Sequence, residues 1–216
     1  MLLPALIQGY TNLKLFILVL LLCNFSLYAE NSPKYSLRFQ TGFSSANDLD
    51  QLYKFQGLNR SDYHTNTIGI DAGYRFVEDL WSLPFDLYAK GGVSYFDENY
   101  HQADFLEATL YIKFLWKLNF LGNQIRLGFG EGVSYAGRVP YTEAQEAIRE
   151  GDNQSNLLNY LDVTADFDLG KLIRVKPLDE VHIGYLIKHR SGVHGLYGGV
   201  SDGGSNYNCI YVEKNF

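Results

Sequence analysis

The chain has 216 residues and a formal net charge of −6, from 24 acidic and 18 basic side chains. An acidic chain lacks the clustered Lys and Arg that neutralise phosphates, so we exclude nucleic acid as a partner. The length suits a single domain. The chain holds 17 Tyr, 14 Phe and 21 Gly but only 5 Pro and 1 Met, which favours β-sheet.

The N-terminus has the features of a secretory signal peptide. An uninterrupted apolar run from Leu15 to Cys23 follows Lys14, and the small residue Ala29 offers a cleavage site. This run is about half of the ~20 residues that a transmembrane helix needs. We therefore expect residues 1–29 to be a signal peptide and residues 30–216 to be the exported domain. Removal of Cys23 would leave Cys209 without an intrachain disulfide partner.

Eight segments of the exported part alternate between apolar and polar residues with a period of two. Each has about the ten residues of a tilted membrane-crossing strand, and its charges fall on the parity opposite the apolar one. An even number of such strands must close, because an open edge would leave backbone groups unpaired in hydrocarbon. The pattern predicts an all-β fold, an eight-stranded antiparallel up-and-down transmembrane β-barrel in the bacterial outer membrane. The predicted strands cover residues 35–43, 67–76, 85–95, 106–116, 125–135, 160–169, 181–191 and 207–216.

Two further expectations follow from the barrel. The lumen of an eight-stranded barrel is filled by side chains, so the inward charges should pair with one another. Phe216 has the outward parity, and an aromatic C-terminal residue is typical of chains that the barrel-assembly machinery recognises. The alternative is a soluble barrel such as a lipocalin, which would require an apolar lumen.

The connections between these strands alternate in length. Short ones, at residues 78–84, 117–124 and 170–180, suit periplasmic turns. Long ones suit extracellular loops, and within one of them Tyr141–Glu150 is expected to form a short helix. The long connections cover residues 44–64, 97–104, 140–156 and 192–205.

Candidate chemistry lies at the end of the seventh predicted strand, where the outward parity changes from apolar residues to His189 and Ser191. A His and a Ser two positions apart on a strand face the same way, as a base and a nucleophile must. Polar groups on a lipid-facing wall are costly and are candidates for function; the alternative is that the strands have left the membrane there. The neighbouring strands add Glu131, Asn159, Asn206 and Asn208 to this outward set.

The barrel and its motif resemble the outer-membrane lipid A 3-O-deacylases, the PagL family, which carry a His-x-Ser motif on the outward wall near the C-terminus. His189-Arg190-Ser191 is similar in residue type, place and parity. The resemblance implies that Ser191 is the nucleophile and His189 the general base. It also implies hydrolysis of an ester-linked acyl chain, with lipid A of lipopolysaccharide as the partner and with no metal or other cofactor.

The chain departs from this family at two positions. The family usually has Asn after the Ser, whereas here Gly192 leaves only its backbone N–H to hold the oxyanion. The resemblance places the orienting residue near the start of the last strand, where Asn206 is the best match and Asp202 the acidic alternative. The competing hypothesis is a non-catalytic barrel with an adhesion or structural role. A hydrogen bond between Ser191 and His189, with a third polar group behind the imidazole, would distinguish the two.

Overall fold

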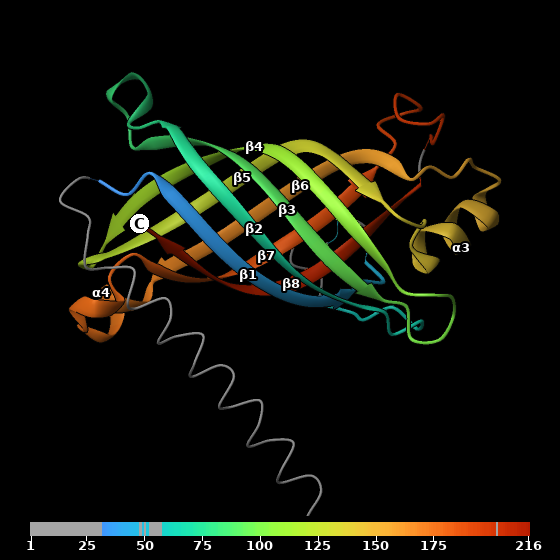
Figure 1. Cartoon of the computed structure of the whole chain (residues 1–216), viewed down its shortest axis with the longest axis horizontal. Coiled ribbons are helices and arrows are strands. Elements are labelled where there is room, and N and C mark those ends of the chain that lie inside the picture. Colours follow the sequence, from blue (N-terminus) through green and yellow to red (C-terminus); the bar gives the residue numbers. More distant parts are fainter. Residues whose placement is uncertain (1–31, 48, 50, 52–57, 202) are drawn as a thin grey trace, which may run out of the picture.

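Eight antiparallel strands close into one barrel, in which each strand pairs with the next and the last pairs with the first (Figure 1). The computed structural model describes residues 32–47, 49, 51, 58–201 and 203–216. The predicted signal peptide and Asp202 therefore lie outside the described residues. The predicted fold class, the strand number and the up-and-down order are confirmed.

The strands are long enough to cross a membrane when tilted, with 10 to 16 residues each. They are β1 (Tyr35–Ser44), β2 (Asn66–Val77), β3 (Phe85–Asp97), β4 (Phe105–Phe120), β5 (Asn123–Ala136), β6 (Leu157–Asp168), β7 (Val181–Ser191) and β8 (Gly204–Asn215). The helices described are α3 (Tyr141–Glu150), α4 (Leu169–Ile173) and the short 3-10 turns η2 (Leu80–Ser82) and η3 (Lys176–Leu178). No helix in the described part of the chain is long and apolar enough to cross a membrane.

The two ends of the barrel differ as the connection lengths predict (Figure 1). The end with α3 carries the long loops, and the other end carries α4 and the C-terminus. The expected helix at Tyr141–Glu150 is confirmed.

Two details at the short-loop end differ from the prediction. The strands β4 and β5 extend until only Leu121 and Gly122 join them, both with positive φ (51° and 79°), as a tight hairpin turn requires. Leu169 is not the last residue of a strand but the first of α4, because the Asp168 side chain accepts a hydrogen bond from the Lys171 N–H (3.0 Å) and caps the helix.

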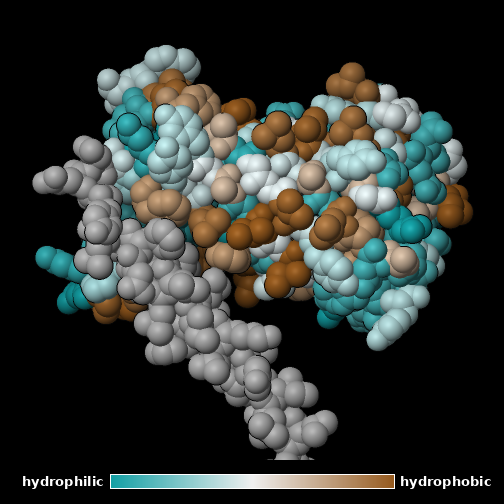
Figure 2. Space-filling view, viewed as in Figure 1, coloured by the Kyte–Doolittle hydropathy of each residue, from teal (hydrophilic) through white to brown (hydrophobic). Residues whose placement is uncertain are grey.

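The outer wall of the barrel is apolar between its ends. Figure 2 shows hydrophobic side chains along the middle of the wall and hydrophilic ones gathered towards the two ends. A soluble monomer rarely exposes so much contiguous apolar surface, whereas a lipid-facing wall requires it. The exposed apolar residues with outward parity include Ile68, Ile70, Tyr74, Val93, Leu106, Leu110, Ile112, Leu127, Phe129, Phe167 and Ile210.

The lumen holds a network of buried ion pairs, which confirms the predicted pairing of inward charges. Arg38 bonds to Asp71 (2.6 Å) and to Asp162 (2.5 Å). Lys113 shares Asp162 with Arg38. Further pairs join Lys90 to Asp71 and Glu213, Arg126 to Asp166 and Glu213, and Lys188 to Glu107. This charged lumen differs from the apolar one that a lipocalin-like barrel would require.

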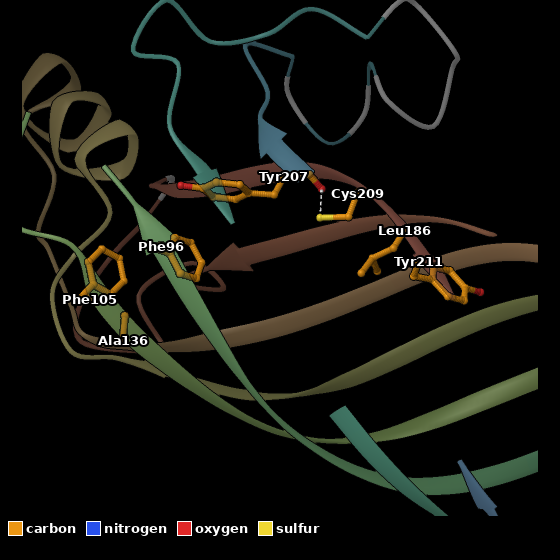
Figure 3. Packing of buried hydrophobic residues seen from close by; sticks show 7 residues of the cluster. All are labelled: Phe96, Phe105, Ala136, Leu186, Tyr207, Cys209 and Tyr211. Carbon is orange, nitrogen blue, oxygen red and sulfur yellow. Dashed lines mark hydrogen bonds between the residues drawn. The ribbon is translucent and has the colours of Figure 1, made fainter. Parts of the chain in front are cut away.

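The lumen also holds a cluster of buried, mostly apolar side chains, which begins near α3 (Figure 3). Phe96 stacks on Phe105 with ring centroids 4.9 Å apart, and Tyr207 meets Phe96 edge-on at 5.0 Å. Cys209 belongs to the same cluster, where its thiol is buried and free. Leu186 of β7 and Tyr207 and Cys209 of β8 belong to this cluster. The inner face of these two strands is therefore packed behind the residues on their outer face. The members of the cluster are Phe96, Phe105, Ala136, Leu186, Tyr207, Cys209 and Tyr211.

Candidate functional site

The register of β7 and β8 brings His189 and Asn206 side by side on the outer wall. The two residues are direct partners in the ladder, and both have outward parity. The distance from His189 Nδ1 to Asn206 Oδ1 is 2.7 Å, a normal hydrogen bond. Asn206 also donates its Nδ2–H to the backbone carbonyl of Asn47, at 3.1 Å. The imidazole therefore has a polar partner that is itself held by the first long loop.

Ser191 lies two residues beyond His189 on the same face of β7, opposite Gly204. Among the described residues no hydrogen bond joins the Ser191 hydroxyl to the His189 ring. Of the two contacts that would distinguish a catalytic site, the structure thus contains the third polar group behind the imidazole and lacks the direct Ser–His bond. Catalytic hydrogen bonds are often long in the absence of substrate and shorten when it binds.

A pocket with a volume of about 300 Å³ lies over these side chains. Its walls come from three parts of the chain that are distant in sequence: the first long loop, α3, and the loop between β7 and β8. The pocket is lined by Leu49, Glu146, His189, Ser191, Gly192, Val193, His194, Ser201, Gly203, Gly204 and Asn206. It is large enough for the polar end of an ester and too small for a whole lipid.

Gly192 has no room for a side chain. A Cβ built at this position would lie 2.0 Å from the Val200 carbonyl oxygen, which no real Cβ tolerates. The Gly192 carbonyl also accepts the Tyr197 N–H at 3.0 Å, so the loop after β7 folds directly onto this residue. This loop conformation explains physically why an Asn side chain cannot stand after Ser191.

The barrel is similar in fold to that of PagL. The crystal structure of the outer membrane enzyme PagL aligns with a TM-score of 0.55 and 12% identity, over 84% of this chain and 99% of that one. Neisserial surface protein A aligns with a TM-score of 0.48 and 14% identity, over 87% and 100%. The N-terminal β-barrel domain of Pseudomonas aeruginosa OprF aligns with a TM-score of 0.42 and 9% identity, over 86% and 100%. No protein-family model and no curated protein sequence matches the chain.

At 12% identity the likeness to PagL shows the fold alone. Together with the closed barrel and the apolar wall, it identifies the chain as a β-barrel of the bacterial outer membrane. The roles that the sequence suggests for Ser191, His189, Asn206 and Gly192 stay predictions.

The other outward polar residues do not join the pocket. Glu131 is exposed on β5, but Leu161 stands between it and His189 in the ladder. Asn159 faces Ser191 across β6 and β7, and Asn208 accepts a hydrogen bond from the Tyr185 hydroxyl.

Within the described residues, no three His, Cys, Asp or Glu side chains are grouped so that they could hold a metal.

The site includes residues that were not predicted from the sequence, among them Asn47, Leu49 and Glu146. They belong to the first long loop and to α3, and they reach the site only through the folding of those segments over the barrel end. No periodic signal marks such residues, because a loop has no fixed alternation of faces.

Proposed function

We propose that this chain is an outer-membrane esterase that removes an ester-linked acyl chain from lipid A, with Ser191 as the nucleophile and His189 as the general base. The observation that carries the proposal is the hydrogen bond between His189 and Asn206, beside Ser191, on the outward face of the barrel. An oriented imidazole at the edge of an apolar wall has little structural reason to be there, since polar groups facing lipid are costly.

The chemistry follows from the positions of these atoms. Ser191 Oγ attacks the ester carbonyl while its proton passes to His189 Nε2, the ring nitrogen that does not face Asn206. The negative oxygen of the tetrahedral intermediate is held by the Gly192 N–H. The intermediate collapses as the bond from the acyl carbon to the sugar oxygen breaks, and His189 transfers its proton to that oxygen, which leaves as a hydroxyl. Water then gives a proton to His189 Nε2 and attacks the acyl-Ser191 ester, and the proton returns to Ser191 Oγ as the fatty acid is released.

The location of the pocket supports a lipid of the outer leaflet as the substrate. The pocket lies at the barrel end that carries the long loops, which face the outside in barrels of this kind. Below it, the outward face continues with the exposed Ile210 of β8 beside the half-buried Tyr185 of β7, and an acyl chain would lie along this face. The ester of a lipid A molecule in the outer leaflet would thus meet Ser191 at the boundary between headgroups and acyl chains.

A second candidate is a barrel with an adhesion or structural role. The missing hydrogen bond between Ser191 and His189, and Gly192 in place of an Asn, favour it. In that case the polar residues on the outer wall would contact water or headgroups, and the long loops would carry the function.

The test is mass spectrometry of lipid A from a Gram-negative host that expresses the chain. We expect the wild type to remove one acyl mass and Ser191→Ala to leave lipid A intact. Ser82→Ala, at an exposed serine of the opposite barrel end, is the matched control and should act like the wild type. Intact lipid A with a well-folded wild-type barrel would refute the esterase, and deacylation by Ser191→Ala would refute its nucleophile.

A further inference from the structure

The Asn206 amide has two different edges, and each faces a different partner. Its Nδ2–H points to the Asn47 backbone carbonyl, at 3.1 Å, and its Oδ1 faces His189 Nδ1, at 2.7 Å. A backbone carbonyl only accepts hydrogen bonds, so the NH₂ group must be on the Asn47 side. The oxygen then faces the ring, which requires the proton to be on Nδ1 and leaves Nε2 as the free base.

The Asn47 carbonyl is itself held in place. The Asn47 N–H donates to Ser45 Oγ (3.0 Å), and Asn47 Oδ1 accepts the Asn59 N–H (2.9 Å). The Ser45 N–H donates to the Asn206 carbonyl at 2.8 Å, which ties the same segment to β8. Asn47 is 6% exposed, so water has little access to compete for these bonds. The first long loop therefore presents a fixed acceptor to Asn206.

This contact matters because an amide can present either an acceptor or a donor to the imidazole, whereas a carboxylate presents an acceptor in both rotamers. Both oxygens of an aspartate or glutamate accept, so such a residue orients a neighbouring imidazole in either rotamer. An Asn rotated by 180° would present its NH₂ group to His189 and would move the ring proton to Nε2. A base in the wrong tautomer cannot take the proton of the serine, and such a change in a Ser-His-Asp triad lowers kcat by about 10⁴-fold.

We infer that Asn47 is a positioning residue, whose backbone carbonyl fixes the Asn206 amide and so sets the tautomer of His189 that the Ser191 chemistry needs. The catalytic consequence rests on the proposed esterase function. The effect on the tautomer does not, because it concerns only the His189 and Asn206 side chains and the Asn47 carbonyl.

The first test compares the effect of one substitution on kcat in two backgrounds, the wild type and an Asn206→Asp variant. Asn47→Gly removes the side-chain anchor to Asn59 and loosens the backbone at the carbonyl. We expect kcat for lipid A deacylation to fall at least about tenfold, with KM changed less, because a fraction of the imidazole adopts the wrong tautomer. In an Asn206→Asp background the same substitution should leave kcat unchanged or raise it, since a carboxylate accepts in both rotamers and the opposing carbonyl repels it.

The second test reads the tautomer directly, by ¹⁵N NMR of the labelled protein in detergent micelles, with His189→Gln to assign the signal. We expect the Nδ1–H form in the wild type and a shift towards Nε2–H in Asn47→Gly. The control is Asn123→Ala, which removes a similar bracing side chain, bonded to the Asp168 backbone at 3.1 and 3.2 Å, at the other barrel end. This control should change neither readout.

The outcomes separate the two proposals. A shifted tautomer in a barrel with no activity on lipid A would support the positioning role of Asn47 and refute the esterase. An unchanged tautomer in a folded Asn47→Gly barrel would overturn the inference even if the wild type is active. If Asn47→Gly lowers kcat equally in the wild type and in the Asn206→Asp background, the inference is also overturned, since a general loosening of the loop explains that result.

Discussion

At the scale of single residues, position 192 shows how backbone packing limits the chemistry of the site. The Val200 carbonyl occupies the space in which a side chain at 192 would begin. The oxyanion of the proposed reaction thus depends on a backbone N–H alone, and loss of a single oxyanion donor typically costs about 10²- to 10³-fold in kcat. We therefore expect slower turnover than a site with a second donor would reach.

The packing at this position gives a prediction on stability. Gly192→Ala must displace the loop after β7, because its Cβ would lie 2.0 Å from Val200 O, and we expect a loss of about 1–3 kcal/mol. Gly91→Ala is the control, since the nearest atom to its Cβ is 3.6 Å away. Thermal unfolding in detergent micelles measures both. Equal melting temperatures for the two variants would show that the loop yields without cost.

At the scale of elements, α3 is attached to the barrel through a buried carboxylate. Glu143 accepts a hydrogen bond from the Ser205 hydroxyl (3.1 Å) and lies 3.4 Å from the Arg190 guanidinium. Burial raises the pKa of Glu143 to about 7, although Arg190 and Ser205 act in the opposite direction. The nearby carboxylates Glu107 and Glu146 add to the rise.

This pKa predicts how the attachment of α3 depends on pH. The folded state binds the Glu143 proton more tightly than the unfolded chain, whose ordinary value is 4.5. Its contribution to stability is therefore complete below about pH 4.5 and is lost as the pH rises to about 7, by at most about 3 kcal/mol. Hydrogen-exchange protection of the α3 amides should fall over this range in the wild type. Glu143→Gln, which stays neutral, should remove the dependence, and protection that rises with pH would contradict the argument.

The elements also show which parts of the structure alternation can predict. The alternation of apolar and polar residues predicted the strands, because successive side chains of a strand point to opposite faces and one face of this barrel must suit lipid. It also placed His189, Ser191 and Asn206 on one face. It did not predict that Leu121 and Gly122 form a two-residue turn, or that Leu169 begins a helix, since both depend on local turn and cap geometry. Nor did it predict the contact of Asn206 with Asn47, which depends on how a long loop folds back onto β8.

At the scale of the whole molecule, the ion pairs of the lumen join strands from all sides of the barrel. Arg38 on β1 reaches Asp71 on β2 and Asp162 on β6, and Lys113 on β4 shares Asp162. Side chains from opposite walls thus meet inside the barrel, as expected for eight strands, whose lumen is just wide enough for side chains to fill.

The central position of Asp162 predicts that its charge is essential for stability. Asp162→Asn keeps the shape but leaves Lys113 with no carboxylate and Arg38 with only Asp71, so we expect a loss of about 3–5 kcal/mol in urea unfolding. Adding Lys113→Met removes the unpaired cation and should restore part of the loss. Glu150→Gln, which breaks an exposed pair with Arg149, should cost less than about 1 kcal/mol. If Asp162→Asn and Glu150→Gln cost the same, the buried network would be no more stabilising than a surface pair.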